Sequence, residues 1–388
     1  MGKENMKRHG HLWERITSDE NIRLGIVNAC RSRNRKTPAK KRNILYTKEH
    51  EEETVSKIKT LLLDDFHTSP YYVYPLFDPK LRFIYCLPFY PDRIIHHCLM
   101  NVLAPIWDRL MYNGSCACRK GHGQHEAGTR CGIYAKKYSY CAQFDISQFY
   151  VNINHRILKG IVSHKIKDNK VLEILGGIID SIDTRKKNLT MLYRMRKAGN
   201  TCKDIPREIQ KLEAAAARDE AEEDVGLPIG NYTSQWLGNL YLNELDTFIK
   251  QVLCVKAYVR YCDDFLLFSD DKKMLHAYAE AIQDFLWEKL RMMLSKKEVF
   301  PTSQGIDFVG YRYFHTGLVL LRKRTAKKQR QAIKEIRKSI ENGTVDVDEA
   351  RARLGSMHGL LKWAQSYHFR RAIHFSETLE EVGRLGKV

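Results

Sequence analysis

Apolar positions recur along the chain with two different periods, and these periods divide it into helical and strand-rich segments. Residues 1–60 carry helical periodicity, which a basic stretch at residues 31–42 interrupts as a flexible connector. In residues 71–93 the aromatic and β-branched content rises and four prolines punctuate the pattern, which predicts short strands and turns. Helical spacing returns over residues 94–112. The first third of the chain is therefore predicted to be helical with one strand-rich interruption.

Two later segments predict strands that end at acidic positions. Residues 143–150 predict a strand that runs into a turn, and residues 257–269 predict two short strands around a tight acidic turn. Between them, residues 183–224 predict a charged helix-and-loop insert, basic at first and acidic at its end, of a kind that is usually solvated. Beyond residue 321 the pattern is helical and strongly basic.

The excess of basic residues indicates a nucleic-acid partner. Lysine and arginine outnumber the acids 65 to 46, a net charge of +19, which is typical of proteins that contact a phosphate backbone. A solvated basic surface is the alternative. No apolar run is long enough for a signal peptide or a membrane span, so we expect a soluble, cytoplasmic protein without a membrane partner.

The spacing of the cysteines does not favour a metal site. Ten cysteines without a secretion signal predict reduced and mostly buried thiols. Cys116, Cys118, Cys131 and Cys141 cluster in the sequence, but they lack the paired C-x-x-C spacing of zinc proteins, so a zinc site is the less favoured hypothesis.

Three aspartates form the strongest chemical signal in the chain. Asp263 and Asp264 lie at the tip of an apolar hairpin, where divalent cations would relieve the repulsion between two like charges. Asp145 ends a separate short strand. Nucleotidyl transfer needs two metal ions about 4 Å apart, held by carboxylates from separate strands, and these residues would supply them. The alternative for the acidic pair is an ordinary hairpin turn. Tyr150, five residues after Asp145, is expected under the incoming sugar, where its ring would exclude a 2′ hydroxyl, and the alternative is a core tyrosine.

The order of five motifs resembles the successive palm motifs of reverse transcriptases, including the group II intron and retron types. The motifs are FDISQFY, GLPIGNYTSQ, YCDD, LSKKEVF and IDFVGYRY. Upstream, DPKLRFIYCLPFYPDRIIHH and GSCACRKGHGQHEAG resemble the fingers motifs and the basic loop that follows them. The resemblance covers roughly residues 68–370, and no single motif would carry it alone.

The resemblance implies an α+β fold of the right-hand polymerase type, with fingers, a palm built on an antiparallel sheet, and a helical thumb. The chain is expected to divide into a helical basic N-terminal extension (1–60), fingers (61–142), a palm (143–315, with the charged insert 183–224) and a helical thumb (316–388). The implied activity is that of an RNA-directed DNA polymerase, a nucleotidyltransferase that uses dNTPs, an RNA template and a DNA or RNA primer.

The resemblance also implies roles for the matched positions. Asp145, Asp263 and Asp264 are expected to coordinate two Mg²⁺ ions, with Mn²⁺ as a substitute, beside the backbone of Ile146. Lys297 is expected near the leaving pyrophosphate as a proton donor, and Lys296 is an alternative that the spacing leaves open. Contacts to the nucleotide are expected from Lys80, Arg82, Phe149, Tyr150, Ile229, Gly230 and Gln235. Contacts to nucleic acid are expected from Arg93, Arg119, Lys120, Lys323 and Lys327.

Within the family, the chain is most similar to the reverse transcriptases of diversity-generating retroelements. Their mark is an apolar residue before the glycine of a G-x-x-x-S-Q motif, here Ile229, where most relatives have glutamine. The resemblance implies error-prone synthesis at template adenines (mutagenic retrohoming), a bacterial or phage-encoded system, and a small basic accessory variability protein that binds as an oligomer. The alternatives are a retron, group II intron or phage-defence reverse transcriptase, and a catalytically silent RNA-binding scaffold.

Overall fold

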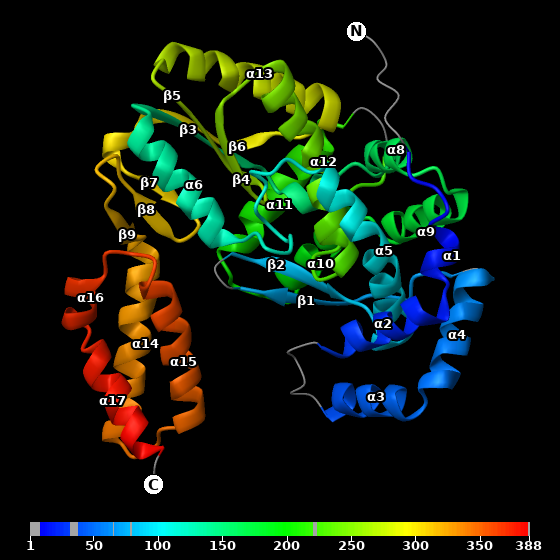
Figure 1. The fold of residues 1–388 in the computed structure, drawn as a ribbon, viewed down its shortest axis with the longest axis horizontal. Coiled ribbons are helices and arrows are strands. Elements are labelled where there is room, and N and C mark those ends of the chain that lie inside the picture. Colours follow the sequence, from blue (N-terminus) through cyan, green and yellow to red (C-terminus); the bar gives the residue numbers. More distant parts are fainter. Residues whose placement is uncertain (1–7, 32–37, 65, 78–79, 220–222, 387–388) are drawn as a thin grey trace. The chain divides into compact units, whose positions relative to one another are not determined.

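The computed structural model describes residues 8–31, 38–64, 66–77, 80–219 and 223–386 (Figure 1). Residues 32–37 of the basic connector predicted at residues 31–42 lie outside these residues, and residues 38–42 are helical rather than a flexible connector. The chain forms two compact units. Unit 1 comprises Met1–Tyr112, Ile146–Val252 and Ile282–Met293. Unit 2 comprises Asn113–Asp145, Leu253–Ala281 and Leu294–Val388.

Unit 1 is mainly helical. Its N-terminal helices are α1 (Trp13–Ile16), α2 (Asp19–Cys30), α3 (Pro38–Glu49), α4 (Glu51–Leu63) and α5 (Ile94–Leu110). Its later helices are α7 (Phe149–Asn152), α8 (His155–Lys165), α9 (Asn169–Ile179), α10 (Thr184–Lys197), α11 (Asp204–Ala216) and α12 (Tyr232–Thr247). Its two strands are β1 (Tyr72–Leu76) and β2 (Arg82–Cys86). The predicted helices at residues 1–60 and 94–112 and the predicted strands at residues 71–93 are confirmed.

The N-terminal helices pack on α5. Ser18 caps α2 by accepting a hydrogen bond from Asn21 N (3.3 Å), and Asp19 follows in the first turn, where the helix dipole favours an acid. Asn21 is itself buried, and its amide donates to the carbonyl of Cys98 in α5 (3.0 Å). Gly25 faces Cys98 so closely that a Cβ atom there would lie 2.5 Å from the sulfur. The two helices therefore meet through small and polar side chains.

One face of the charged insert at residues 183–224 is buried rather than solvated. Its helices α10 and α11 bury Leu192, Ile205, Ile209 and Leu212 against Leu81, Phe83 and Tyr85 of the hairpin segment. Tyr85 also donates its hydroxyl to Asn188 Oδ1 (2.5 Å). The expectation of a solvated insert is wrong for this face, because apolar residues at every third or fourth position of the two helices join one buried cluster with residues 81, 83 and 85.

Unit 2 is built on a four-stranded antiparallel sheet in the order β4-β5-β3-β6 (Figure 1). These strands are β3 (Tyr140–Ile146), β4 (Ala257–Tyr261), β5 (Asp264–Ser269) and β6 (Leu294–Pro301). A smaller sheet contains β7 (Ile306–Phe308), β8 (Tyr311–Tyr313) and β9 (Val319–Leu321). Two helices accompany the strands, α6 (Gln124–Lys137) and α13 (Lys272–Leu290), and the last residues of α13 belong to unit 1. The strands predicted at residues 143–150 and 257–269 are confirmed.

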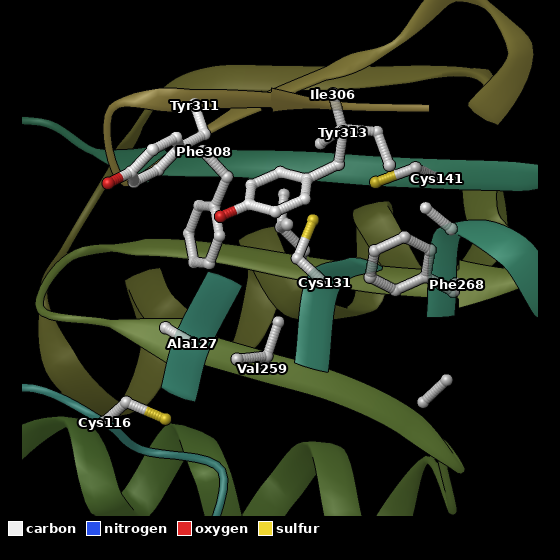
Figure 2. Close-up of a cluster of buried hydrophobic side chains, with 13 residues drawn as sticks. Cys116, Ala127, Cys131, Cys141, Val259, Phe268, Ile306, Phe308, Tyr311 and Tyr313 are labelled. Carbon is white, nitrogen blue, oxygen red and sulfur yellow. The ribbon is translucent and has the colours of Figure 1, made fainter. Parts of the chain in front are cut away.

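A buried cluster joins these elements of unit 2. It contains Cys131 and Ala127 of α6, Cys141 of β3, Phe268 of β5, and aromatic residues of β7 and β8. Figure 2 shows Tyr313 beside Cys131, with Cys116 at the edge of the cluster. Helix α6 therefore covers one face of the sheet, and the small side chains of the helix allow close approach.

The basic C-terminal segment forms helices α14 (Lys323–Glu341), α15 (Val347–Leu361), α16 (Tyr367–Ala372) and α17 (Phe375–Leu385), as predicted. These helices have a core of their own, in which Ile333, Leu354, Met357 and Val382 are buried. Asp346 caps α15 by accepting a hydrogen bond from Glu349 N (3.0 Å).

All ten cysteines are free thiols, but only five of them are buried, fewer than the prediction of mostly buried thiols implied. Among the residues that the structure describes, no helix is both long and apolar enough to cross a membrane.

Candidate active site

The three predicted carboxylates all lie in unit 2, at one end of its four-stranded sheet. Asp145 in β3 is paired directly with Asp264 in β5, and Tyr261 in β4 is paired with Asp264 from the other side. Asp263 and Cys262 form the two-residue turn between β4 and β5. Cys262 takes a positive φ of 56°, as the first central residue of a primed hairpin turn does. Directly opposed residues of antiparallel strands share one face, so the sheet brings Asp145 and Asp264 together.

Burial and like charge act together on Asp264. Burial is the main cause that raises the pKa of Asp264 to about 7, and the negative charges of Asp145 and Asp263 add to it. The Gln143 amide, whose nitrogen lies 3.4 Å from Asp264 Oδ1, and the Lys296 ammonium oppose this shift. Charges crowded in this way are stabilised by a divalent cation bound between them, so the donor set fits the predicted metal role. Ile146 follows Asp145 as the last residue of β3.

The two lysines that the sequence left as alternatives point in different directions. Lys296 donates to Gln143 Oε1 (2.8 Å), and Gln143 in turn contacts Asp264. Lys297 instead forms an ion pair with Glu280 of α13, with Nζ 2.9 Å from Oε2. Of the two lysines, Lys296 is therefore the one whose ammonium reaches a side chain in contact with the carboxylates.

Two polar residues beside the carboxylates were missed by sequence reasoning. Gln143 lies two positions before Asp145, so strand alternation alone could have placed it on the same face. Ser295 donates its hydroxyl to the side chain of Asp145 and to its carbonyl oxygen (3.2 Å). Nothing in the sequence pattern singles out Ser295, because its role depends on which strand β6 pairs with.

The opposite side of the same strands is apolar. Phe144 and Phe265 stack with ring centroids 4.8 Å apart, and Tyr258 meets Phe265 edge to face. Arg260 is fully buried and donates to the carbonyl of Cys262 (3.0 Å), in the turn that carries Asp263. The aromatic packing and this hydrogen bond fix the hairpin, so the carboxylates project from a rigid support.

The predicted nucleotide-binding residues all lie in unit 1. Arg82 begins β2, and the exposed Lys80 precedes it. Tyr85 of the same strand donates its backbone N–H to the carbonyl of Ile229 (2.8 Å), which ties the residue 229–230 segment to the hairpin. Gly230 has a φ of +125°, and a Cβ atom there would lie 2.6 Å from the Tyr85 carbonyl oxygen.

Two of the predicted nucleotide contacts, Phe149 and Tyr150, lie on α7. The rings of Phe149 and Tyr150 meet edge to face with centroids 5.1 Å apart. A Cβ atom on Gly238 of α12 would lie 3.2 Å from each ring, so these aromatics pack closely on α12. Gln235 is exposed on the same helix.

The predicted nucleic-acid contacts differ in accessibility. Lys120 is exposed, as are Lys323 and Lys327 on α14. Arg119, by contrast, is only 8% exposed and donates to the carbonyl of Ser115 (2.9 Å), so it holds a loop within unit 2. Arg93 in unit 1 is half-buried, and burial lowers its pKa.

Comparison with known proteins identifies the family. The model of the family "Reverse transcriptase (RNA-dependent DNA polymerase)" matches residues 77–313, which include all three carboxylates. The chain belongs to this family, and its mixed α+β fold with antiparallel sheets is the expected right-hand polymerase fold.

Two proteins illustrate how distant the similarity is. Protein YkfC of Escherichia coli (strain K12) is 23% identical over 291 residues, which cover 64% of this chain and 66% of YkfC. Telomerase from Candida albicans, solved in complex with a TWJ fragment of telomeric RNA, matches with a TM-score of 0.44 and 12% identity. That match covers 88% of this chain and 60% of the telomerase chain.

Proposed function

We propose that this chain is an RNA-dependent DNA polymerase that makes cDNA by two-metal nucleotidyl transfer. The observation that carries the proposal is the convergence of Asp145, Asp263 and Asp264 at one end of a sheet, with the pKa of Asp264 raised to about 7. A silent RNA-binding scaffold would gain nothing from three crowded acids, since their repulsion destabilises the fold unless cations are bound.

The reaction follows from these residues. Two bound Mg²⁺ ions, or Mn²⁺ in their place, would activate the primer 3′ hydroxyl and neutralise the triphosphate. Asp145, Asp263 and Asp264 would hold the ions. The 3′ oxygen forms a bond to the α-phosphorus of the dNTP, while the bond from that phosphorus to the leaving pyrophosphate breaks. The RNA template selects the dNTP by base pairing.

Positive side chains would act on the leaving group. Lys80 and Arg82 would offset the charge of the triphosphate as pyrophosphate departs. Lys296 is the better placed of the two alternatives to donate a proton, because its ammonium is hydrogen-bonded on the carboxylate side, whereas Lys297 is paired with Glu280. The pyrophosphate oxygen would take that proton.

Phe149, Tyr150, Ile229 and Gly230 would form the walls that contact the incoming nucleotide. The Tyr150 ring would exclude a 2′ hydroxyl and so favour deoxynucleotides. Gln235 would line the same pocket from α12. The helices after residue 316 would act as the thumb, where Lys323 and Lys327 contact phosphates without reading sequence.

Primer extension tests the activity. The wild-type chain, given an RNA template, a DNA primer, Mg²⁺ and all four dNTPs, should extend the primer. Asp263→Ala should abolish extension while RNA binding and folding are retained, because the basic surface is unchanged. Glu288→Ala, which removes an exposed acid on α13, is the matched control and should extend normally. RNA binding with no extension by the wild type, even with the cognate RNA and its partners, would favour the scaffold.

We further propose the diversity-generating subtype, with error-prone synthesis at template adenines and a basic accessory protein oligomer as partner. The support is Ile229, an apolar side chain that makes fewer directional contacts to a nascent base pair than glutamine would. With isoleucine in place of glutamine, a mispair leaves no amide of this residue without a hydrogen bond, so the polymerase rejects the mispair less strongly. Sequencing the products should show errors concentrated at template adenines, and Ile229→Gln should lower them. An unchanged error spectrum would contradict this proposal and favour the retron, intron or phage-defence types.

A further inference from the structure

Three side chains of different chemistry meet around the start of α6. The sulfur of Cys116, an imidazole nitrogen of His122 and a carboxylate oxygen of Glu126 all lie within 4.8 Å of one another. None of them belongs to the Asp145, Asp263 and Asp264 set. We propose that Cys116, His122 and Glu126 bind one divalent cation of the zinc class, at a second metal site separate from the catalytic carboxylates.

The local chain brings these residues together over eleven positions. Glu126 lies in the first turn of α6, and His122 precedes it by four residues. Gly121, with a φ of +81°, turns the chain just before His122. Cys116 is held at the far end of the loop, because its N–H donates to the carbonyl of Arg260 (2.9 Å). Short spacings between ligands are typical of protein zinc sites.

One ring nitrogen of the histidine contacts a carboxylate without a hydrogen bond. His122 Nδ1 lies at ion-pair distance from Glu126 Oε2 (2.6 Å), yet this buried atom forms no hydrogen bond to any residue that the structure describes. The carboxylate is thus beside the nitrogen but outside hydrogen-bond geometry. A cation shared by the two atoms would satisfy both, whereas the metal-free arrangement leaves the buried nitrogen without a hydrogen bond.

The second oxygen of Glu126 is already oriented. Arg130 donates to Glu126 Oε1 from Nε (3.0 Å) and from an Nη atom (2.9 Å). Because both hydrogen bonds end on Oε1, they leave Oε2 facing His122. Ligating carboxylates are commonly fixed by such outer hydrogen bonds, which increase metal affinity.

The donor set selects the class of ion. One sulfur, one imidazole nitrogen and one carboxylate oxygen suit Zn²⁺, and also Co²⁺ as its spectroscopic substitute. Mg²⁺ and Ca²⁺ prefer oxygen ligands alone. The Cys116 thiolate and the Glu126 carboxylate would match the charge of a divalent ion. With three protein ligands, a tetrahedral ion would keep one position for water.

Such an ion would brace the hairpin that carries the catalytic aspartates. Ser115 forms a β-bridge with Arg260, next to the Cys116 hydrogen bond to the same residue. Arg260 also donates to Cys262 in the hairpin turn. A metal that fixes Cys116 to the start of α6 would therefore restrict the motion of β4, and we expect it to raise the thermal stability of the chain.

Cobalt binding to the full chain tests the proposal. The protein is stripped with a chelator and titrated with Co²⁺ in excess Mg²⁺, which keeps the oxygen-only carboxylate site occupied. We expect a thiolate-to-cobalt charge-transfer band that saturates at one equivalent and is displaced by Zn²⁺. His122→Asn and Glu126→Gln should each weaken Co²⁺ binding by about 100-fold, at the upper end of what even outer partners contribute. Zn²⁺ should raise the unfolding temperature of the wild type but not of His122→Asn.

Matched variants separate this site from other thiols and imidazoles. Cys116→Ser should remove the sulfur band, whereas Cys118→Ser and His315→Asn, both at exposed positions of unit 2, should retain it. Should Cys116→Ser fail to fold because its site is fully buried, the partly exposed His122 and Glu126 variants decide. The absence of a sulfur band in the wild type, or its loss in Cys118→Ser alone, would overturn the proposal.

Discussion

Gly230 lies against the backbone of the β1–β2 hairpin, and an alanine there would have to displace that hairpin. Its φ of +125° is strained for any residue with a Cβ atom, at a cost of about 1–2 kcal/mol. The added Cβ would lie 2.6 Å from the Tyr85 carbonyl oxygen, which is backbone and cannot rotate away. Relief of the clash would lengthen the Tyr85 N to Ile229 O hydrogen bond, which contributes about 1 kcal/mol. Gly230→Ala should therefore destabilise unit 1 by about 2–3 kcal/mol.

Gly199→Ala is the matched control for this prediction. Gly199 also has a positive φ, +76°, but apart from its chain neighbours no heavy atom of the described residues lies within 4 Å of its Cβ position. Both substitutions affect the unfolded chain equally, so the difference between them isolates the clash with Tyr85.

The comparison needs two measurements. Urea unfolding followed by circular dichroism should show a larger loss for Gly230→Ala, by about 1 kcal/mol. Hydrogen exchange at the Tyr85 amide should become faster in that variant alone, and the KM for dNTPs should rise with it. Equal destabilisation by both substitutions, with Tyr85 equally protected, would refute the reasoning.

Three further outcomes are expected. Lys296→Ala should lower kcat for primer extension by about 100-fold, as loss of a general acid does, whereas Lys297→Ala should lower it by less than about threefold. The reverse order would contradict the role of Lys296 as proton donor. Burial lowers the pKa of His96 to about 3, so the unfolded chain binds a proton that the folded chain excludes. The free energy of unfolding, measured in urea, should therefore fall by about 2 kcal/mol between pH 6.5 and pH 5. The fall should be smaller in His96→Gln, and an equal fall in that variant would exclude His96 as the cause. The double variant Lys323→Ala and Lys327→Ala should reduce by about 2 the slope of the logarithm of RNA affinity against the logarithm of salt concentration. An unchanged slope would exclude both lysines from the RNA interface.

The sequence was sufficient to predict the strands and the positions of the three aspartates at one end of them. The apolar runs before Asp145 and around Asp263 have the length and composition of buried strands, and the acidic pair falls where only a turn could expose it. Ordered motifs then supplied the family, which the family comparison confirms.

The directions of individual side chains could not be predicted in the same way. Strand alternation states that Lys296 and Lys297 face opposite sides, but which one meets Gln143 depends on how β6 lies beside β3. Arg119 was predicted to contact nucleic acid because it is basic and lies in the loop GSCACRKGHGQHEAG, yet its guanidinium donates to the carbonyl of Ser115 within that loop. Contacts of this kind depend on tertiary register, which periodicity does not encode.

The packing of α10 and α11 under the β1–β2 hairpin bears on attempts to shorten this enzyme. Deleting residues 183–224 would remove the partners of Leu81, Phe83 and Tyr85 and leave a contiguous apolar underside in water. The same strand carries Arg82, so a truncated polymerase would lose order at a residue proposed to grip the triphosphate. A compact version would need polar replacements on the underside of β2, or a substitute helix to cover it.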